Sequence, residues 1–315
     1  MTRLQGFPDF FIIGAPRCGT TSLSRYVMRH PRVCFSRPKE THYFARLNGL
    51  PSEGDLKRDY IDRYFGHRTA GQSLAGEGSV SYIHLPAVIE QILSFNPRAK
   101  FIAMVRNPLT MLPSYHQKML FLLQEREANF ERAWALQTMR AQGKNLPGTC
   151  LDPRLLNYTE VASLGAQVER LFDIVGRKQV HVIVFDDFTA DTLSVYRALL
   201  DFLELDYDGQ TEFERRFESQ MYRSYWLQYL FFKTATKGGK FADTLERKSR
   251  KYREDGTIKP NLIKRITKLN KGPVKPSPLT PRVADSIREA LRDDVRLLGH
   301  ILQRDLGFWL ARPDQ

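Results

Sequence analysis

Residues 10–23 read FFIIGAPRCGTTSL, and this stretch decides the fold class. An apolar run typical of a buried strand ends at Gly14, a short loop follows, and a helix is predicted to begin at Thr20. The spacing from Gly14 to Gly19 is that of the phosphate-binding loop GxxxxGK[ST]. Thr20 stands where that loop has its lysine, and the only nearby cation is Arg17, inside the loop. The stretch therefore predicts a phosphate site that lacks the usual lysine.

Short apolar runs alternate with helical patterns along the rest of the chain. Near-continuous apolar strands separated by helices indicate a parallel sheet covered on both faces, which is an α/β three-layer sandwich that contains a P-loop. Ligands in such sheets bind at the carboxyl ends of the strands. The predicted strands are 9–14, 32–36, 74–79, 100–106 and 179–188, and the predicted helices are 20–30, 54–65, 85–95, a long helix after Pro108, 191–205 and 280–304.

We expect residues 1–315 to form a single domain. The chain has 315 residues, 42% of them hydrophobic, which is enough for a sizeable core. Residues 206–278 are predicted to be irregular, and within them 237–278 is predicted to be a basic, mobile insertion. The closing helix 280–304 begins well, because Thr280 suits an N-cap and Pro281 suits the first helical position.

The basic character of the chain is concentrated in one segment. Residues 237–275 contain thirteen Lys and Arg against four Asp and Glu, so they supply +9 of the formal net charge of +13. A local basic segment predicts an anionic partner, here an acidic acceptor or a membrane surface. The alternative is a solvated loop whose charges serve only solubility. A nucleic-acid-binding module would use the same charge but would not explain the glycine loop, so no specific nucleic-acid partner is expected.

Cysteine usage and hydropathy favour a soluble, cytoplasmic protein. Cys18, Cys34 and Cys150 are odd in number and widely spaced, which argues against a disulfide framework and a structural zinc site. No apolar stretch is long enough to span a bilayer, and the N-terminus does not read as a signal peptide. Two interpretations of Cys18 are open. It is either a thiol activated by a helix N-terminus or a small residue that fills a tight turn.

The glycine loop offers the groups that bind phosphate. A strand that turns sharply into a helix directs several backbone N–H groups and the positive end of the helix dipole at one point. A nucleoside-triphosphate enzyme would also need the loop lysine and an acidic residue for magnesium near the end of a neighbouring strand. The neighbouring strand is followed by Arg106 instead, so the site is predicted to be cationic and to need no metal. The expected phosphate ligands are the backbone and side chains of Cys18, Gly19, Thr20, Thr21 and Ser22.

These motifs resemble those of the sulfotransferases that use 3′-phosphoadenosine 5′-phosphosulfate (PAPS), in particular bacterial and carbohydrate (heparan-type) members. PRCGTTSL after FFIIG resembles the 5′-phosphosulfate loop, with Arg17 in place of the family's lysine. FIAMVRNPLTMLPSYHQ resembles the 3′-phosphate segment, in which Arg106 and Ser114 have the family's spacing. The resemblance implies that Cys18 to Ser22 hold the 5′-phosphate, and that Arg106 and Ser114 hold the 3′-phosphate.

Two further segments support the resemblance. SRPKETHYF (36–44) resembles the KExxFF segment of carbohydrate sulfotransferases, whose glutamate is the catalytic base. The resemblance implies that Glu40 removes the acceptor proton while Arg17 meets the charge on the leaving group, with His42 as a second candidate base. The alternative for Glu40 is a surface carboxylate paired with Lys39 or an arginine. Residues 279–309 resemble the family's closing helix and its DLxxW ending.

Other parts of the family pattern are less complete here. Glu77 and Tyr82, in EGSVSY, match an ExSxxY-like segment, and they are expected either to orient the acceptor or simply to pack. No RKG loop is present to complete the 3′-phosphate site. Three substitutes compete for that role, namely Arg223, the KGGK at 237–240, and Lys271 with Gly272.

The resemblance predicts a PAPS-dependent sulfotransferase that transfers a sulfuryl group to a hydroxyl of a carbohydrate or glycolipid without a metal. A P-loop kinase or nucleotide phosphotransferase is the second hypothesis, and the missing lysine counts against it. The third is a polyanion-binding protein that uses residues 237–275. The sequence does not identify the acceptor.

Overall fold

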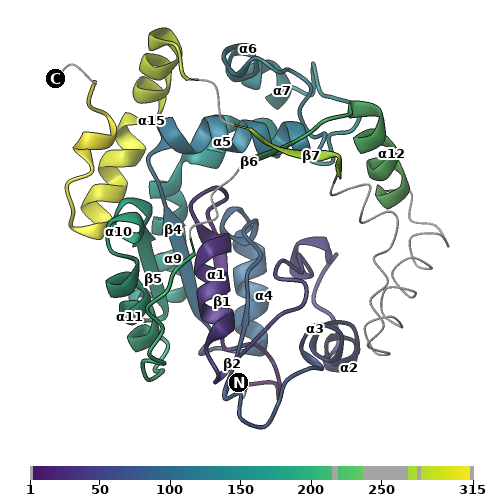
Figure 1. The fold of residues 1–315 in the computed structure, drawn as a ribbon, viewed down its shortest axis with the longest axis vertical. Coiled ribbons are helices and arrows are strands. Elements are labelled where there is room, and N and C mark those ends of the chain that lie inside the picture. Colours follow the sequence, from purple (N-terminus) through teal and green to yellow (C-terminus); the bar gives the residue numbers. More distant parts are fainter. Residues whose placement is uncertain (1–2, 215–218, 237–268, 275–277, 313–315) are drawn as a thin grey trace. The chain divides into compact units, whose positions relative to one another are not determined.

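The computed structural model describes residues 3–214, 219–236, 269–274 and 278–312 (Figure 1). Contacts divide the chain into two compact units. Unit 1 comprises Met1–Met111, Val161–Phe217 and Asp285–Gln315, and unit 2 comprises Leu112–Glu160 and Glu218–Ala284. That the chain forms one domain stays a prediction. The predicted mobile insertion falls mainly on 237–268, which lies outside the described residues.

Unit 1 contains a five-stranded parallel sheet, which confirms the predicted fold class. The strand order is β2-β3-β1-β4-β5, so the strand that leads into the glycine loop lies at the centre. The residues of β1 and the last five of β4 are buried, because both faces of these strands are covered. The strands are β1 (Phe10–Gly14), β2 (Val33–Phe35), β3 (Leu74–Glu77), β4 (Lys100–Val105) and β5 (Val180–Val184).

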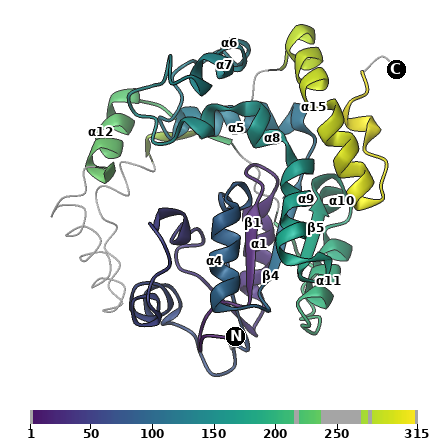
Figure 2. The ribbon, with the colours of Figure 1, turned by 180° about the vertical axis from the view of Figure 1, so that it is seen from behind.

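Helices cover both faces of this sheet. Figure 1 shows α1 (Thr20–Arg29) in front of the strands, and Figure 2 shows α4 (Pro86–Phe95) and α9 (Leu164–Val175) in front of the opposite face. After β1 the chain moves toward the β2 edge of the sheet, whereas after β3 and β4 it moves toward the β5 edge. Because crossovers between parallel strands are right-handed, helices that connect strands in opposite directions lie on opposite faces of the sheet. Further unit 1 elements are α2 (Glu53–Leu56), a π-helical turn (Lys57–Ile61), α3 (Asp62–Phe65), α10 (Phe185–Ala190), α11 (Thr192–Phe202) and short 3₁₀ turns at Phe44–Arg46, Tyr82–His84, Arg177–Gln179 and Gly307–Trp309.

The predicted strand 179–188 is too long. The strand ends at Val184, and Phe185–Ala190 forms helix α10. Phe185 extends the apolar pattern of the strand by one residue, so the sequence predicts a strand that is too long. In the structure the Phe185 ring lies beside the glycine loop, 3.0 Å from where a Cβ on Gly19 would be.

The prediction that residues 206–278 are irregular holds for 206–214, which contain no helix or strand, and is wrong for 219–236 and 271–274. β6 (Ser219–Tyr222) pairs antiparallel with β7 (Lys271–Val274), and helix α12 (Tyr225–Thr236) follows β6 directly. The two strands lie far apart in the sequence, and Pro273 in β7 weakens the strand pattern, so local reading did not find the pair.

Unit 2 is organised around a buried ion pair. Arg140 donates to both carboxylate oxygens of Glu125, at 2.6 and 2.7 Å, and Tyr158 donates to the same carboxylate at 2.7 Å. Burial alone would raise the pKa of Glu125, but the bonds from Arg140 and its neighbours outweigh burial and lower it. The other elements here are α6 (Phe130–Ala135), α7 (Gln137–Ala141) and a 3₁₀ turn at Pro153–Leu156, while α5 (Pro108–Phe121), α8 (Tyr158–Ala162) and α15 (Pro281–Leu302) each continue from one unit into the other.

Gly76 is a sharp test of the sheet's central packing. It pairs with Phe10 across β1 and β3, and a Cβ at Gly76 would lie 2.1 Å from the Phe10 ring. Gly76→Ala is therefore expected to destabilise the protein by about 1–3 kcal/mol, which urea unfolding would measure as a lower midpoint. Gly71→Ala is the matched control, because nothing lies within 4 Å of its Cβ position. Equal midpoints for the two variants would contradict this packing.

Candidate functional site

The glycine loop has the backbone geometry that a close ligand approach requires. β1 ends at Gly14, and Gly19 stands at the left-handed φ of 95° immediately before α1. A Cβ on Gly19 would lie 3.0 Å from the Phe185 ring and 3.2 Å from the Met104 methyl group. Glycine is therefore required there both by the backbone angle and by the space available.

The first turn of α1 is left open for an anion. No side chain caps the helix, and its first turn contains no acidic residue. The positive end of the helix dipole and the first backbone N–H groups therefore face the loop without a neutralising carboxylate. Of the hydroxyl residues predicted to assist, Thr20 and Ser22 are buried and Thr21 is exposed.

Two arginines meet at this loop, as the sequence predicted. The guanidinium of Arg106 donates to the backbone oxygen of Arg17 at 3.0 Å and to Thr110 Oγ1 at 3.0 Å. It also lies over the Phe185 ring, 4.3 Å from the centroid. Burial lowers the pKa of the Arg17 guanidinium, and repulsion from Arg106 lowers it further. Two like charges held at a helix N-terminus form a site that favours an anion with several negative charges.

Cys18 is a packing residue in this structure. Its side chain has no exposed surface, and its Sγ lies 3.6 Å from both the Pro16 carbonyl oxygen and Met111 Sδ. Burial raises the pKa of the thiol to about 12, although both arginines oppose the rise. A thiol with that pKa carries almost no thiolate at neutral pH, so the structure favours the turn-filling interpretation over the reactive one.

Glu40 is ionised and held between two neighbours. Lys39 Nζ lies 2.9 Å from its Oε1, and His42 Nε2 lies 3.2 Å from its Oε2. Burial by itself would raise the pKa of Glu40, but the hydrogen bonds and charges of His42 and Lys39 outweigh burial and lower it to about 2. Because this lies below the ordinary value near 4.5, Glu40 favours folding above that pH and loses the contribution as the pH falls toward 2. The predicted pairing with Lys39 is found, and the same ionised state is what a general base requires.

Glu77 and Tyr82 lie in the interior, with no exposed side-chain surface. The Glu77 carboxylate accepts hydrogen bonds from the hydroxyls of Thr41, Ser79 and Tyr60. The structure therefore favours packing over direct contact with an acceptor for both residues. Thr41, Ser79 and Tyr60 were not singled out from the sequence, because a buried polar network has no short-range signature.

The remaining predicted residues belong to unit 2. Ser114 lies in α5 and is buried. Arg223 and Gly272 were treated as competitors, yet β6 and β7 bring them together: a Cβ on Gly272 would lie 3.6 Å from Arg223 Nε. The Arg223 backbone N–H also bonds to the Asn270 carbonyl at 2.7 Å, which fixes the end of this strand pair. Lys271 pairs with Tyr222 in the same ribbon, whereas the KGGK at 237–240 lies outside the described residues.

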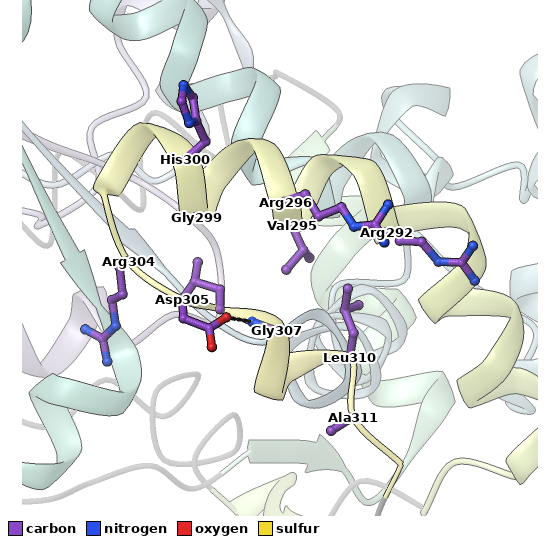
Figure 3. Close-up of a pocket in the computed structure, with 11 residues that line it drawn as sticks. Arg292, Val295, Arg296, Gly299, His300, Arg304, Asp305, Gly307, Leu310 and Ala311 are labelled. Atoms are coloured by element: carbon purple, nitrogen blue, oxygen red, sulfur yellow. Dashed lines mark hydrogen bonds between the residues drawn. The ribbon is translucent and has the colours of Figure 1, made fainter. Parts of the chain in front are cut away.

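A separate pocket of about 650 Å³ lies between the second half of α15 and the segment that follows it (Figure 3). None of the predicted site residues lines it. Figure 3 shows that Arg292, His300 and Arg304 point in different directions rather than toward one point. Arg292 also pairs with Glu289, and Arg304 pairs with Asp187, so the cations of this pocket are largely neutralised by their own neighbours.

The described residues contain neither a cluster of metal ligands nor a helix that could span a membrane. They contain no group of three or more His, Cys, Asp or Glu side chains arranged to hold a metal ion. The helices of the described ranges are all too short or too polar to cross a bilayer.

Comparison with known families identifies the fold. The family described as "Sulfotransferase domain" matches residues 7–255, which include the glycine loop, Glu40 and Arg106. The chain belongs to this sulfotransferase family. The match confirms the resemblance to sulfotransferases that the glycine loop and the segment around Arg106 indicate in the sequence.

Individual relatives agree with this assignment over part of their length. Carbohydrate sulfotransferase 15 of Mus musculus is 50% identical over 152 residues, covering 36% of this chain and 27% of that protein. Membrane-associated sulfotransferase kil1 of Dictyostelium discoideum is 28% identical over 134 residues, covering 41% of this chain and 27% of that protein. The bifunctional heparan sulfate N-deacetylase/N-sulfotransferase 1 of Caenorhabditis elegans is 25% identical over 121 residues, covering 37% and 13%. The chain thus spans about a quarter or less of these relatives.

A solved structure supports the fold over the whole chain. The sulfotransferase from Alicyclobacillus acidocaldarius superposes with a TM-score of 0.65 at 23% identity, and the match covers 96% of this chain and 99% of that one. The two proteins therefore share the sulfotransferase fold. An identity of 23% supports this likeness of architecture and nothing about the acceptor.

The state of Cys18 in the sulfotransferase loop can be tested by thiol labelling. In native protein at pH 8, Cys150, which is partly exposed, is expected to react with iodoacetamide first, while Cys18 stays unmodified until the protein is unfolded. Peptide mass spectrometry measures both sites. The Cys150→Ser variant is the control, and labelling of native Cys18 at the rate of an exposed thiol would contradict its burial.

Proposed function

We propose that this chain transfers a sulfuryl group from PAPS to a hydroxyl of a carbohydrate or glycolipid acceptor. The observation that carries the proposal is the pair of arginines at a lysine-free glycine loop, in a chain of the sulfotransferase family. PAPS is the donor substrate, and its bound form supplies a sulfuryl group on a good leaving nucleotide. The groups of this chain bind the donor, orient it and receive the acceptor's proton.

The residues of the loop fit an anionic donor. Gly19 leaves no room for a Cβ, the first turn of α1 is uncapped, and Arg17 and Arg106 repel one another when no anion lies between them. We infer that the N–H groups of residues 18–21, with Thr20, Thr21 and Ser22, hold the 5′-phosphate. Arg17 then stabilises the negative charge that develops on the leaving group, and it does so electrostatically because arginine is a poor proton donor.

The 3′-phosphate site is inferred from three elements. Arg106 offers a planar guanidinium that can bind a phosphate through two hydrogen bonds, and Ser114 follows it by eight residues. Within unit 2, β6 and β7 bring Arg223 next to Gly272 and pair Tyr222 with Lys271, so we treat Arg223, Lys271 and Gly272 as one basic element instead of as competitors, and the family resemblance alone assigns this element to the 3′-phosphate. A 3′-phosphate distinguishes PAPS from ATP, so these residues would select the donor.

Glu40 is proposed as the general base that takes the acceptor's proton. Its carboxylate is ionised at every pH of interest, and it is 36% exposed, so it can reach a hydroxyl. A positioned general base contributes up to 10²- to 10⁴-fold to a rate, with the largest effects where its pKa lies near the working pH, so a carboxylate with a pKa of about 2 acts here mainly through its position. His42 lies on the same carboxylate and is placed to hold it and to share the proton.

A kinase is the second candidate, and the acids beside the site argue against it. The two aspartates that follow β5 are already engaged. Asp186 accepts from the Trp309 indole N–H at 3.2 Å, and Asp187 accepts from Arg304 at 2.8 Å. The loop has no lysine, and these two carboxylates are already engaged, so among the described residues next to β5 neither aspartate is available to hold a magnesium ion.

The acceptor class and the location are proposals of the same kind. Relatives named for carbohydrate and heparan sulfate support a glycan hydroxyl as the acceptor. An acidic glycan or a membrane surface would suit the charge of residues 237–275. The three cysteines are unpaired, which is consistent with a reducing compartment such as the cytoplasm.

Transfer of ³⁵S from labelled PAPS to a panel of glycans and glycolipids tests the proposal. Wild-type protein in EDTA is expected to label at least one hydroxyl acceptor, and Glu40→Gln is expected to lower kcat by about 100-fold or more. Glu90→Gln, which changes an exposed carboxylate on α4, is the matched control and should retain full activity.

Failure would be clear in either of two results. Full activity of the Glu40 variant would remove its role as base. Labelling of no acceptor, combined with phosphoryl transfer from ATP and magnesium, would favour the kinase.

A further inference from the structure

The Glu77 carboxyl group is fully buried and has an unusual set of partners. It stands at the end of β3 and has no exposed surface, and at least three hydroxyls donate hydrogen bonds to it, with the Tyr82 hydroxyl also lowering its pKa. Thr41 Oγ1 donates to Oε1 at 2.9 Å, Ser79 donates to the same oxygen, and Tyr60 donates to Oε2. Burying a carboxylate is costly, so an arrangement that supplies three donors points to a use for it.

That use is suggested by what the donors hold in place. Thr41 lies between Glu40 and His42 in the sequence, so its side chain ties the middle of the Glu40 segment to Glu77. The Ser79 hydroxyl, which donates to Glu77, also accepts the His42 backbone N–H at 2.9 Å. Two chains of hydrogen bonds therefore start at Glu77. One ends on Thr41, which follows Glu40 in the sequence, and the other runs through Ser79 to His42, which pairs with the Glu40 carboxylate.

The residues that follow Glu77 fasten the rest of the same segment. The Gly78 N–H donates to the Lys39 carbonyl at 3.1 Å, and the Ser81 hydroxyl bonds to His42 Nδ1 at 2.9 Å. The Tyr82 hydroxyl accepts the Phe44 N–H at 3.3 Å. These bonds surround His42, whose left-handed φ of 48° is uncommon for a non-glycine residue, although histidine adopts it more readily than most.

We propose that Glu77 is the positioning residue for Glu40, acting through Thr41 and Ser79 to hold the Glu40 carboxylate between Lys39 and His42. The proposal rests on the proposed role of Glu40 as base. The Glu77 side chain has no exposed surface, so it cannot reach an acceptor in this structure. Positioning of Glu40, instead of contact with an acceptor, would then explain the glutamate at position 77.

A carboxylate suits this role better than its amide. Glu77 accepts three hydroxyl protons through two oxygens, whereas glutamine would offer one oxygen and an NH₂ group that donates. At least one of the hydroxyls of Thr41, Ser79 and Tyr60 would then have to turn away. Burial raises the pKa of Glu77, while the hydroxyl bonds oppose that rise. In the described residues around it, the other titratable groups are the phenols of Tyr60 and Tyr82, whose pKa values burial raises well above the usual range.

A matched pair of substitutions at Thr41 tests the proposal without changing the buried Glu77 side chain. Thr41→Val keeps the side-chain shape but loses the hydroxyl, and Thr41→Ser keeps the hydroxyl. We expect Thr41→Val to lower kcat by about ten- to a hundredfold, because a small misplacement of a catalytic group has effects of that order. Its affinity for 3′-phosphoadenosine 5′-phosphate should stay within about twofold of wild type, and Thr41→Ser should retain most of the activity.

A double-mutant cycle separates positioning from a general loss of structure. If Thr41 acts through Glu40, adding Thr41→Val to Glu40→Gln should lower kcat no further. An equal loss in both backgrounds, or wild-type kcat for Thr41→Val, would overturn the proposal.

A second readout does not depend on activity. In ¹³C NMR titration of the carboxylates, Thr41→Val is expected to raise the pKa of Glu40, since the bonds from His42 and Lys39 that lower it would lose their geometry. An unchanged Glu40 titration would contradict the proposal. If wild-type protein transfers no sulfuryl group, the proposed function fails, whereas this titration still decides whether Glu77 positions Glu40.

Discussion

The placement of Arg17 and Arg106 at one helix N-terminus is the constraint on which the site depends. Two arginines are held partly buried at the N-terminus of α1, which has no side-chain cap and no acidic residue in its first turn, although the Asp186 carboxylate acts on Arg106. Such an arrangement is unfavourable until an anion lies beside it. The neighbouring structure enforces the arrangement. The Arg106 guanidinium lies over the Phe185 ring, and a Cβ at position 19 would come within 3.0 Å of the same ring, so this ring would have to shift if residue 19 had a side chain.

The second half of the site follows a different physical logic. Around the glycine loop two arginines lie at one helix N-terminus, whereas around Glu40 charges of opposite sign pair with one another. Lys39 and His42 hold the carboxylate, and the hydroxyl network of Glu77 holds the segment that carries all three. A base that is ionised and fixed in place suits a reaction in which positioning and charge stabilisation supply most of the rate.

Much of this could be predicted from local patterns. The apolar run to Gly14 and the glycine spacing predict the central strand, the loop and α1, because the burial of a strand and the type of a turn depend mostly on residues close together in the sequence. The Arg106 position followed from the end of the next apolar strand. Family membership then confirmed the fold class.

The misses share a long-range cause. The pairing of β6 with β7 joins residues about 50 positions apart, so Arg223 and Gly272 were weighed as alternatives although they are neighbours. The burial of Glu77 depends on Tyr60 and Thr41, which come from other segments, so its partners could not be read from EGSVSY. The strand end at Val184 was misplaced because an aromatic residue that flanks a ligand loop looks the same as one that continues a strand.

Calorimetric titration with 3′-phosphoadenosine 5′-phosphate in EDTA tests the central claim most directly. The protein is expected to bind this nucleotide without a metal, to bind ATP with magnesium far more weakly, and to lose at least about tenfold in affinity in both Arg17→Ala and Arg106→Ala, since each removes a charged hydrogen-bonding partner of a phosphate. Thermal melts would establish that the variants remain folded. Equal binding of ATP with magnesium, or unchanged affinity in folded variants of both arginines, would contradict the account.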